Sequence, residues 1–132
     1  MGLFRFEDLQ IGADSIELAD QLFDIADKLE NKKLFRFAEQ LRGAAMSISN
    51  NIAEGSGSFS DKEFSQFLNI ARRSTFECAN IIVLLNRRNL VELSEKTRLF
   101  GELAKLSSKI TNFRKSLTKG KEQRARSLGQ GA

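Results

Sequence analysis

The sequence predicts an all-α protein, an up-down-up-down four-helix bundle assembling as a ring. Proline is absent from the 132 residues, 41% of them are hydrophobic and 29% are charged, a composition that favours uninterrupted helices. Apolar side chains recur at helical spacing in four segments separated by short loops. Such helices close as a bundle, because each apolar stripe has to be buried against the others. We therefore expect one bundle domain over residues 1–117 and a basic, disordered tail over residues 118–132.

The first two helices are expected over residues 10–30 and 33–54. The first has a short apolar stripe made of Leu18, Leu22, Ile25 and Leu29. Its other faces are acidic, because residues 7–30 contain eight carboxylates and a single base, for a net charge of −7. The second helix has a longer stripe made of Leu34, Ala38, Leu41, Ala45, Ile48 and Ile52. We expect Gly55 to end this helix as its C-cap.

The last two helices are expected over residues 61–88 and 94–117. Ser60 and Glu63 form a capping-box signature at the start of the third helix, and Asn89 follows its end. The predicted buried side of the third helix consists of Phe64, Phe67, Leu68, Ala71, Thr75, Cys78, Ile82 and Leu85. That of the fourth consists of Leu99, Leu103, Leu106, Ile110, Phe113 and Leu117. A long coiled coil is the rival fold, but the loops interrupt the apolar period too often for it.

The residue types argue against catalysis and against a metal site. Histidine is absent, which removes the usual general base and the usual metal ligand. The single cysteine, Cys78, lies among predicted core positions, so we expect a small buried apolar side chain. The longest apolar run, residues 81–85, is too short to span a membrane, and residues 1–20 lack the layout of a signal peptide. We expect a cytoplasmic protein that is not an enzyme and needs no cofactor.

A second stripe of small and polar residues runs along the second helix beside the apolar one. With two neighbours, the set consists of Gln40, Arg42, Gly43, Ala44, Ser47, Asn51 and Glu54. Small side chains allow another backbone to approach closely and amides can bond across the contact, so this stripe is a candidate subunit interface. A solvated face fits the same residue types equally well. The acidic first helix, set against a net charge of +7 over residues 31–117, favours head-to-tail contacts between subunits.

Basic residues gather in places that could contact the phosphates of RNA or DNA. The candidates are Arg72, Arg73, Arg87, Arg88, Arg114, Lys115, Lys119, Lys121, Arg124 and Arg126. A ring multiplies weak phosphate contacts through avidity, although a basic tail can also simply keep a chain soluble. Most of the eleven phenylalanines lie at helical core spacing, so we expect them in the core; Phe4 and Phe59 are the exceptions. We expect Glu54 and Glu77 to form ion pairs with Arg42 or Arg72 that hold helices or subunits in register.

One segment of the second helix resembles a known signature. It reads Ser47-Ile48-Ser49-Asn50-Asn51-Ile52-Ala53-Glu54-Gly55. This is similar to the Ser-Ile-Pro-Ser-Asn-Ile-Ala-Glu-Gly pattern of the bacterial four-helix-bundle proteins first noticed as products of intervening sequences in 23S ribosomal RNA genes. Further matches in register are Phe6-Glu7-Asp8-Leu9, Leu34-Phe35, Gln40-Leu41-Arg42, Lys62-Glu63-Phe64, Phe67-Leu68, Ile70-Ala71-Arg72, Ser74 and Glu77. The family's proline is Ser49 here, its tryptophan falls at Gly12, and its proline before the second helix is missing.

The resemblance implies a homopentameric ring of bundles with no known catalysis. The same architecture is shared by the accessory variability proteins of diversity-generating retroelements, basic pentamers that bind a reverse transcriptase and its RNA. We therefore expect a homo-oligomeric adaptor, a pentamer that binds RNA or DNA, and the resemblance implies a reverse transcriptase as a further partner. The alternative is a structural or protein-interaction scaffold that makes no direct contact with nucleic acid.

Overall fold

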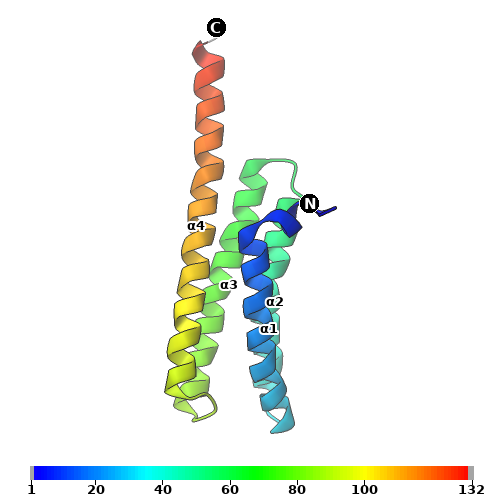
Figure 1. Cartoon of the computed structure of the whole chain (residues 1–132), viewed down its shortest axis with the longest axis vertical. Helices are drawn as coiled ribbons and strands as arrows, with labels where there is room; N and C mark the ends of the chain where they lie inside the picture. The colour runs from blue at the N-terminus through cyan, green and yellow to red at the C-terminus, as the bar shows by residue number, and fades with distance from the viewer. Residues whose placement is uncertain (1, 131–132) are drawn as a thin grey trace.

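Four long amphipathic stretches without proline form four α-helices over the part of the chain that the structure describes. The structure is a computed structural model that describes the backbone of residues 2–130 and the side chains of residues 2–119. A short 3-10 helix, η1 (Arg5–Asp8), precedes α1 (Gln10–Asn31) and α2 (Phe35–Ser56). The chain continues into α3 (Asp61–Arg87) and α4 (Leu93–Gln130). The helices run up and down beside one another, which confirms the predicted all-α bundle (Figure 1).

The predicted apolar stripes face one another and form the core. All four stripe residues of α1 are buried, as are those of α2 from Ala38 onward. In α3 and α4 the stripe residues are buried except for Phe67, Phe113 and Leu117, which are only partly covered. Consecutive helices pack most extensively, α1 on α2, α2 on α3 and α3 on α4. The helical period of the sequence therefore predicted the core correctly.

The α1–α4 seam is the narrowest contact in the bundle and is bridged by polar side chains. Lys109 Nζ lies 2.8 Å from Asp14 Oδ2, and Arg98 Nη1 donates to Gln21 Oε1 at 2.5 Å. The hydrogen bond from Lys109 lowers the pKa of Asp14 below its usual value, an effect that partial burial opposes. Helices that meet in few contacts are thus held in register by directed polar bonds.

Loop chemistry sets three of the helix boundaries. The α1–α2 and α3–α4 connections each place one residue in the left-handed region, Lys33 at φ 63° and Asn89 at φ 60°. Ser60 is the N-cap of α3, since its Oγ accepts a hydrogen bond from Glu63 N at 3.1 Å. The predicted N-cap of α3 and the turn at Asn89 are confirmed.

Two predicted helix ends are wrong. The second helix does not stop at Glu54, because α2 continues through Gly55 to Ser56. Gly55 is helical and buried, and a Cβ added there would lie 2.8 Å from Phe64 Cδ1 and from Phe67 Cβ. It is a close-approach glycine and not a C-cap.

The fourth helix does not stop at Leu117 either: α4 continues to Gln130 and projects beyond the other helices (Figure 1). Good helix formers without proline sustain it after the apolar repeat has ended. The separation of residues 118–132 as a tail stays a prediction.

The phenylalanines are less buried than their spacing predicts. Phe64 is the largest fully buried side chain among the residues described, but Phe35 and Phe76 are 55% and 59% exposed. The expectation that both belong to the core was therefore wrong. Phe4 and Phe59, which were not expected in the core, are exposed.

Between residues 2 and 130 no helix has an apolar stretch long enough to cross a bilayer.

Candidate nucleic-acid interface

The flank of α3 that faces α4 has a stripe of polar and aromatic side chains. It consists of Ser65, Asn69, Arg72 and Phe76, which are four, three and four residues apart and therefore share one face of the helix. Arg114 reaches this stripe from α4. Its Nε donates to Ser65 Oγ at 3.2 Å, and its Nη1 lies 3.4 Å from Asn69 Oδ1.

Asn69 holds two guanidinium groups at once. Arg72 Nη2 donates to Asn69 Oδ1 at 3.2 Å, and Arg114 approaches the same oxygen from the other helix. Because Asn69 and Ser65 are neutral, both guanidinium groups are positioned without losing their net charge. Within the described residues no ion pair joins Arg72, Arg114, Lys115 or Lys119 to a carboxylate. This face of the bundle therefore presents positive charge that no carboxylate among the described side chains, residues 2–119, neutralises by an ion pair.

A shallow groove lies between α3 and α4 at the end of the bundle where residue 119 is found. Its lining consists of Ser65, Thr111, Arg114, Lys115, Thr118 and Lys119, all of which carry a hydroxyl or a cation. Ser65 Oγ accepts the bond from Arg114, so the proton of this hydroxyl can be donated to a ligand. The two threonine hydroxyls donate to backbone carbonyls of α4. A groove lined in this way offers donors and positive charge to a bound anion.

The structure brings together only some of the predicted basic residues. Arg72, Arg114, Lys115 and Lys119 lie along the α3–α4 face, and Arg73 is exposed on the next part of the α3 surface. Arg87 and Arg88 lie at the opposite end of α3, about 33 to 35 Å along the helix axis from Ser65 at 1.5 Å per residue. Lys121, Arg124 and Arg126 belong to residues whose side chains lie outside the described range.

The predicted subunit-interface stripe is partly used inside the chain. Ala44 is 3% exposed and belongs to the core, while Ser47 Oγ and Ser74 Oγ of α3 form a hydrogen bond of 2.7 Å. Asn51 Nδ2 donates to Ser47 O at 2.7 Å and to Ser47 Oγ at 3.1 Å. Gln40, Gly43 and Glu54 are exposed, and a Cβ added at Gly43 would meet nothing within 4 Å. The stripe therefore lies on the α2–α3 seam, with its outer edge open.

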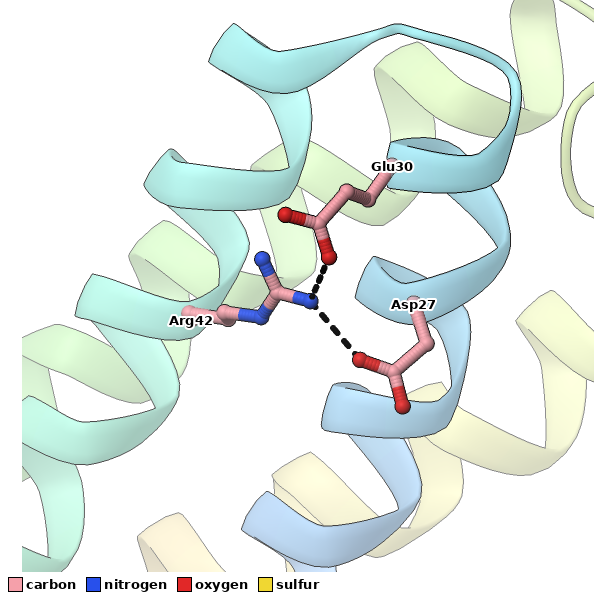
Figure 2. Close-up of polar contacts among 3 residues, drawn as sticks. All are labelled: Asp27, Glu30 and Arg42. Carbon is pink, nitrogen blue, oxygen red and sulfur yellow. Dashed lines mark hydrogen bonds and ion pairs between the residues drawn. The ribbon is translucent and has the colours of Figure 1, made fainter.

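Arg42 of α2 is bound to α1 and not to the acidic residues we predicted for it. Its Nη2 lies 2.7 Å from Asp27 Oδ1 and 3.0 Å from Glu30 Oε2 (Figure 2). The hydrogen bonds that Arg42 donates to the carboxylates of Asp27 and Glu30 raise the pKa of Arg42. Within the chain the predicted ion pairs of Glu54 and Glu77 with Arg42 or Arg72 do not form among the described residues, since Arg42 pairs with α1 and Arg72 with Asn69. The same pairs between subunits stay a prediction. Residues one turn apart at the end of α1 converge on one guanidinium, an arrangement that residue type alone does not specify.

Sequence reasoning missed Ser65, Asn69 and Phe76. A neutral amide between two arginines and an exposed aromatic give no signal until the helices are placed side by side. The four-three-four spacing of this second stripe on α3 could have indicated a distinct face, as it did on α2.

Neither a metal-binding cluster nor an exposed thiol is found among the described residues. No three Cys, Asp or Glu side chains lie close enough there to hold a metal ion. Cys78 is buried in the core, as predicted, and burial raises the pKa of its thiol to about 12. At neutral pH the thiol is protonated and out of reach of solvent.

Comparison with known proteins agrees with the signature in α2. The family model described as 23S rRNA-intervening sequence protein matches residues 7–112, from η1 to the middle of α4. A search of curated proteins returned no match.

Proposed function

Because this chain belongs to the family of 23S rRNA-intervening sequence proteins, we propose that it is a non-enzymatic, cytoplasmic, homo-oligomeric adaptor that binds nucleic acid. We further propose that five copies form a ring. The observation that carries the nucleic-acid part is the pair Arg72 and Arg114, held by the neutral Asn69 and without a carboxylate partner in the described residues. Arginine side chains of this kind bind the phosphates of RNA or DNA, and this binding does not depend on the base sequence.

The assignment of Arg72 and Arg114 to nucleic-acid binding is supported by a contrast with two other cations, Arg42 and Lys109. Arg42 and Lys109 serve the fold, since each binds carboxylates of α1. Arg72 and Arg114 of the α3–α4 face bind neutral oxygens, and Lys115 and Lys119 form no ion pair among the residues described. The positive charge of these four side chains is therefore left for a partner. A ring would repeat this face around its circumference, and several weak phosphate contacts would then act together.

The outer edge of the α2–α3 seam supports the oligomer. Ile70 and Leu84 of α3 are each 44% exposed, and with Glu77 they recur every seven residues on one face. They adjoin the outer edge of the α2 stripe because Ser47 and Ser74 hold that seam together. Aliphatic side chains beside small polar ones provide the mixture that packs against a second copy. The acidic outer face of α1 is a complementary surface for a basic neighbour.

The oligomer is tested by placing a large side chain at the open glycine of the stripe. Gly43→Arg should lower the native mass of the assembly, because the added side chain has room within the chain but none between packed copies. Gly101→Arg is the matched control, since Gly101 is also exposed on a helix with nothing within 4 Å of an added Cβ. Native mass spectrometry or light scattering gives the mass. A wild-type protein that is monomeric at micromolar concentration contradicts the proposal.

Nucleic-acid binding is tested by anisotropy titrations of labelled RNA and DNA over a range of salt concentrations. Wild-type protein should bind at low salt and lose affinity steeply as salt rises, with a logarithmic slope of about 0.7 to 0.9 per phosphate contact. Replacing Lys119, Lys121, Arg124 and Arg126 by alanine should make that slope smaller. If neither RNA nor DNA is retained at low salt, the nucleic-acid part fails.

A protein-interaction scaffold is the second candidate, and the α1–α2 face favours it. Phe35 and Met46 are exposed on the face of α2 that carries Arg42, and Ile16 is exposed on the face of α1 that carries Asp27, about three turns away from it. Exposed apolar side chains on one face are a common feature of surfaces that bind another protein. A reverse transcriptase is the partner that the resemblance to the retroelement proteins suggests. The test uses a reverse transcriptase that is encoded beside this chain. Wild-type protein should retain this enzyme, and Met46→Glu should lose it.

A further inference from the structure

Phe76 extends the cationic stripe of α3 with an exposed aromatic ring. It lies one turn beyond Arg72 on the same face, and its ring is 59% exposed. The Arg72 guanidinium carbon lies 5.6 Å from the ring centroid, a cation–π distance that helps to hold both side chains in place. The core of the bundle does not need this ring, because Phe64 and the aliphatic stripes fill it.

The cations and the ring are arranged as single-stranded nucleic acid would require. Phe76 is about 10 Å along the axis from Asn69 at 1.5 Å per residue, the span of a few nucleotides. Proteins that bind single strands combine a positive groove for the backbone with aromatic rings on which unpaired bases stack. A duplex keeps its bases inside and offers no flat face to an exposed phenylalanine. The ring therefore discriminates between the two forms, whereas the cations do not.

The groove between α3 and α4 offers donors and positive charge to the phosphates of a nucleic-acid strand. Ser65 can donate its hydroxyl proton, Arg114 is fixed between Ser65 and Asn69, and Lys115 and Lys119 line the same groove. Asn69 acts as a positioning residue, because it orients both guanidinium groups and leaves their charge intact.

We propose that the α3–α4 face takes single-stranded nucleic acid, with phosphates in the groove at Ser65 and Arg114 and a base stacked on Phe76. This inference rests on the proposed nucleic-acid function and adds the form of the ligand. An acidic α1 from a second copy would also satisfy the cations, but it would leave the exposed ring without a use.

The decisive variant removes the ring and keeps the charge. Phe76→Leu should weaken binding of a labelled single-stranded oligonucleotide by about fivefold to a hundredfold, the loss of one stacked base. Binding to a duplex of equal length and to heparin, a polyanion without bases, should be unchanged. Phe35→Leu is the matched control, since Phe35 is exposed to nearly the same degree on another face of the bundle. It should change none of the three affinities.

A second variant tests the positioning residue. Asn69→Asp places a carboxylate between Arg72 and Arg114, so binding of single strands, duplex and heparin should all weaken by at least tenfold. Asn50→Asp makes the same charge change at an exposed position of α2 and should have a much smaller effect.

The possible outcomes separate the two proposals. If no nucleic acid binds at low salt, the proposed function fails and this inference fails with it. If single strands and duplex bind equally well and Phe76→Leu changes neither, nucleic-acid binding stands and the single-strand inference is overturned. It is also overturned if Phe76→Leu weakens heparin binding equally, or if Asn69→Asp or Phe76→Leu lowers the mass of the assembly. In that last case the face is a contact between copies.

Discussion

Gly55 is the position where one added methyl group should affect stability most clearly. It lies in the last turn of α2, where the backbone passes close to α3. An alanine Cβ would lie 2.8 Å from Phe64 Cδ1, 2.8 Å from Phe67 Cβ and 3.2 Å from Phe64 Cε1. Carbon atoms in ordinary contact are about 3.5 to 4.0 Å apart, so the methyl group cannot fit unless the two helices separate. The Phe67 Cβ is attached directly to the α3 backbone and cannot swing away.

The expected change in stability is the balance of two effects. Overpacking a filled site costs about 1 to 3 kcal/mol. Alanine in place of glycine within a helix contributes about 1 kcal/mol in the other direction. Gly55→Ala should therefore destabilise the protein by up to about 2 kcal/mol. Gly101→Ala, in α4 with nothing near the added Cβ, isolates the helical effect and should stabilise by up to about 1 kcal/mol.

The measurement is urea unfolding followed by helical circular dichroism, with both variants and wild type at one protein concentration. A fixed concentration matters because an oligomer is more stable when it is more concentrated. The midpoint for Gly55→Ala should fall below wild type, and that for Gly101→Ala should rise above it. A Gly55→Ala midpoint equal to or above that of Gly101→Ala would refute the close approach of α2 and α3.

Three further predictions concern single side chains. Ser60→Ala removes the N-cap bond to Glu63 N and should destabilise the protein by about 1 kcal/mol in urea unfolding, whereas Ser108→Ala, at an exposed position within α4, should have little effect. Because folding lowers the pKa of Asp14, the carboxylate should contribute its full stabilisation above the unfolded-state pKa near 3.8 and lose it as the pH falls through the folded-state pKa. The unfolding midpoints of wild type and Asp14→Asn should therefore converge in acid. A difference between them that stays constant with pH would contradict the Lys109 bond. Cys78, buried and with its pKa raised to about 12, should react with a thiol reagent only as fast as the protein opens, so rapid labelling of native protein would show that the α3 core is open.

The sequence was sufficient for the core because burial follows the helical period. Leu22, Ile48, Ile82 and Ile110 lie one on each helix at predicted stripe positions, and all four are buried. Hydrophobic spacing is a property of one helix alone, so it needs no knowledge of the partner helix.

Contacts between helices were harder to predict, because they depend on rotation and register. Arg42 pairs with Asp27 and Glu30 across the α1–α2 seam, although Glu54 and Glu77 were equally plausible partners by residue type. Gly55 has the sequence of a helix end, and only the approach of Phe64 shows why glycine is needed there.

The candidate site lies between these two cases. The cations of α3 and α4 were predicted as phosphate ligands, but their grouping around the neutral Asn69 could not be, because it arises where two helices meet. Phe76 was assigned to the core because aromatic residues at helical spacing usually belong there, and its position on the α4 flank of α3 places it at the surface.

The sequential packing of the helices also affects the order in which they can fold during synthesis. Each extensive seam joins helices that follow one another along the chain, so the loop that must close before a hairpin gains its contacts is short. A helical hairpin can therefore form while the next helix is still being synthesised, and contacts of this local kind fold quickly. The polar bonds between α1 and α4 join residues 77 and 95 positions apart, so they should form after the local hairpins.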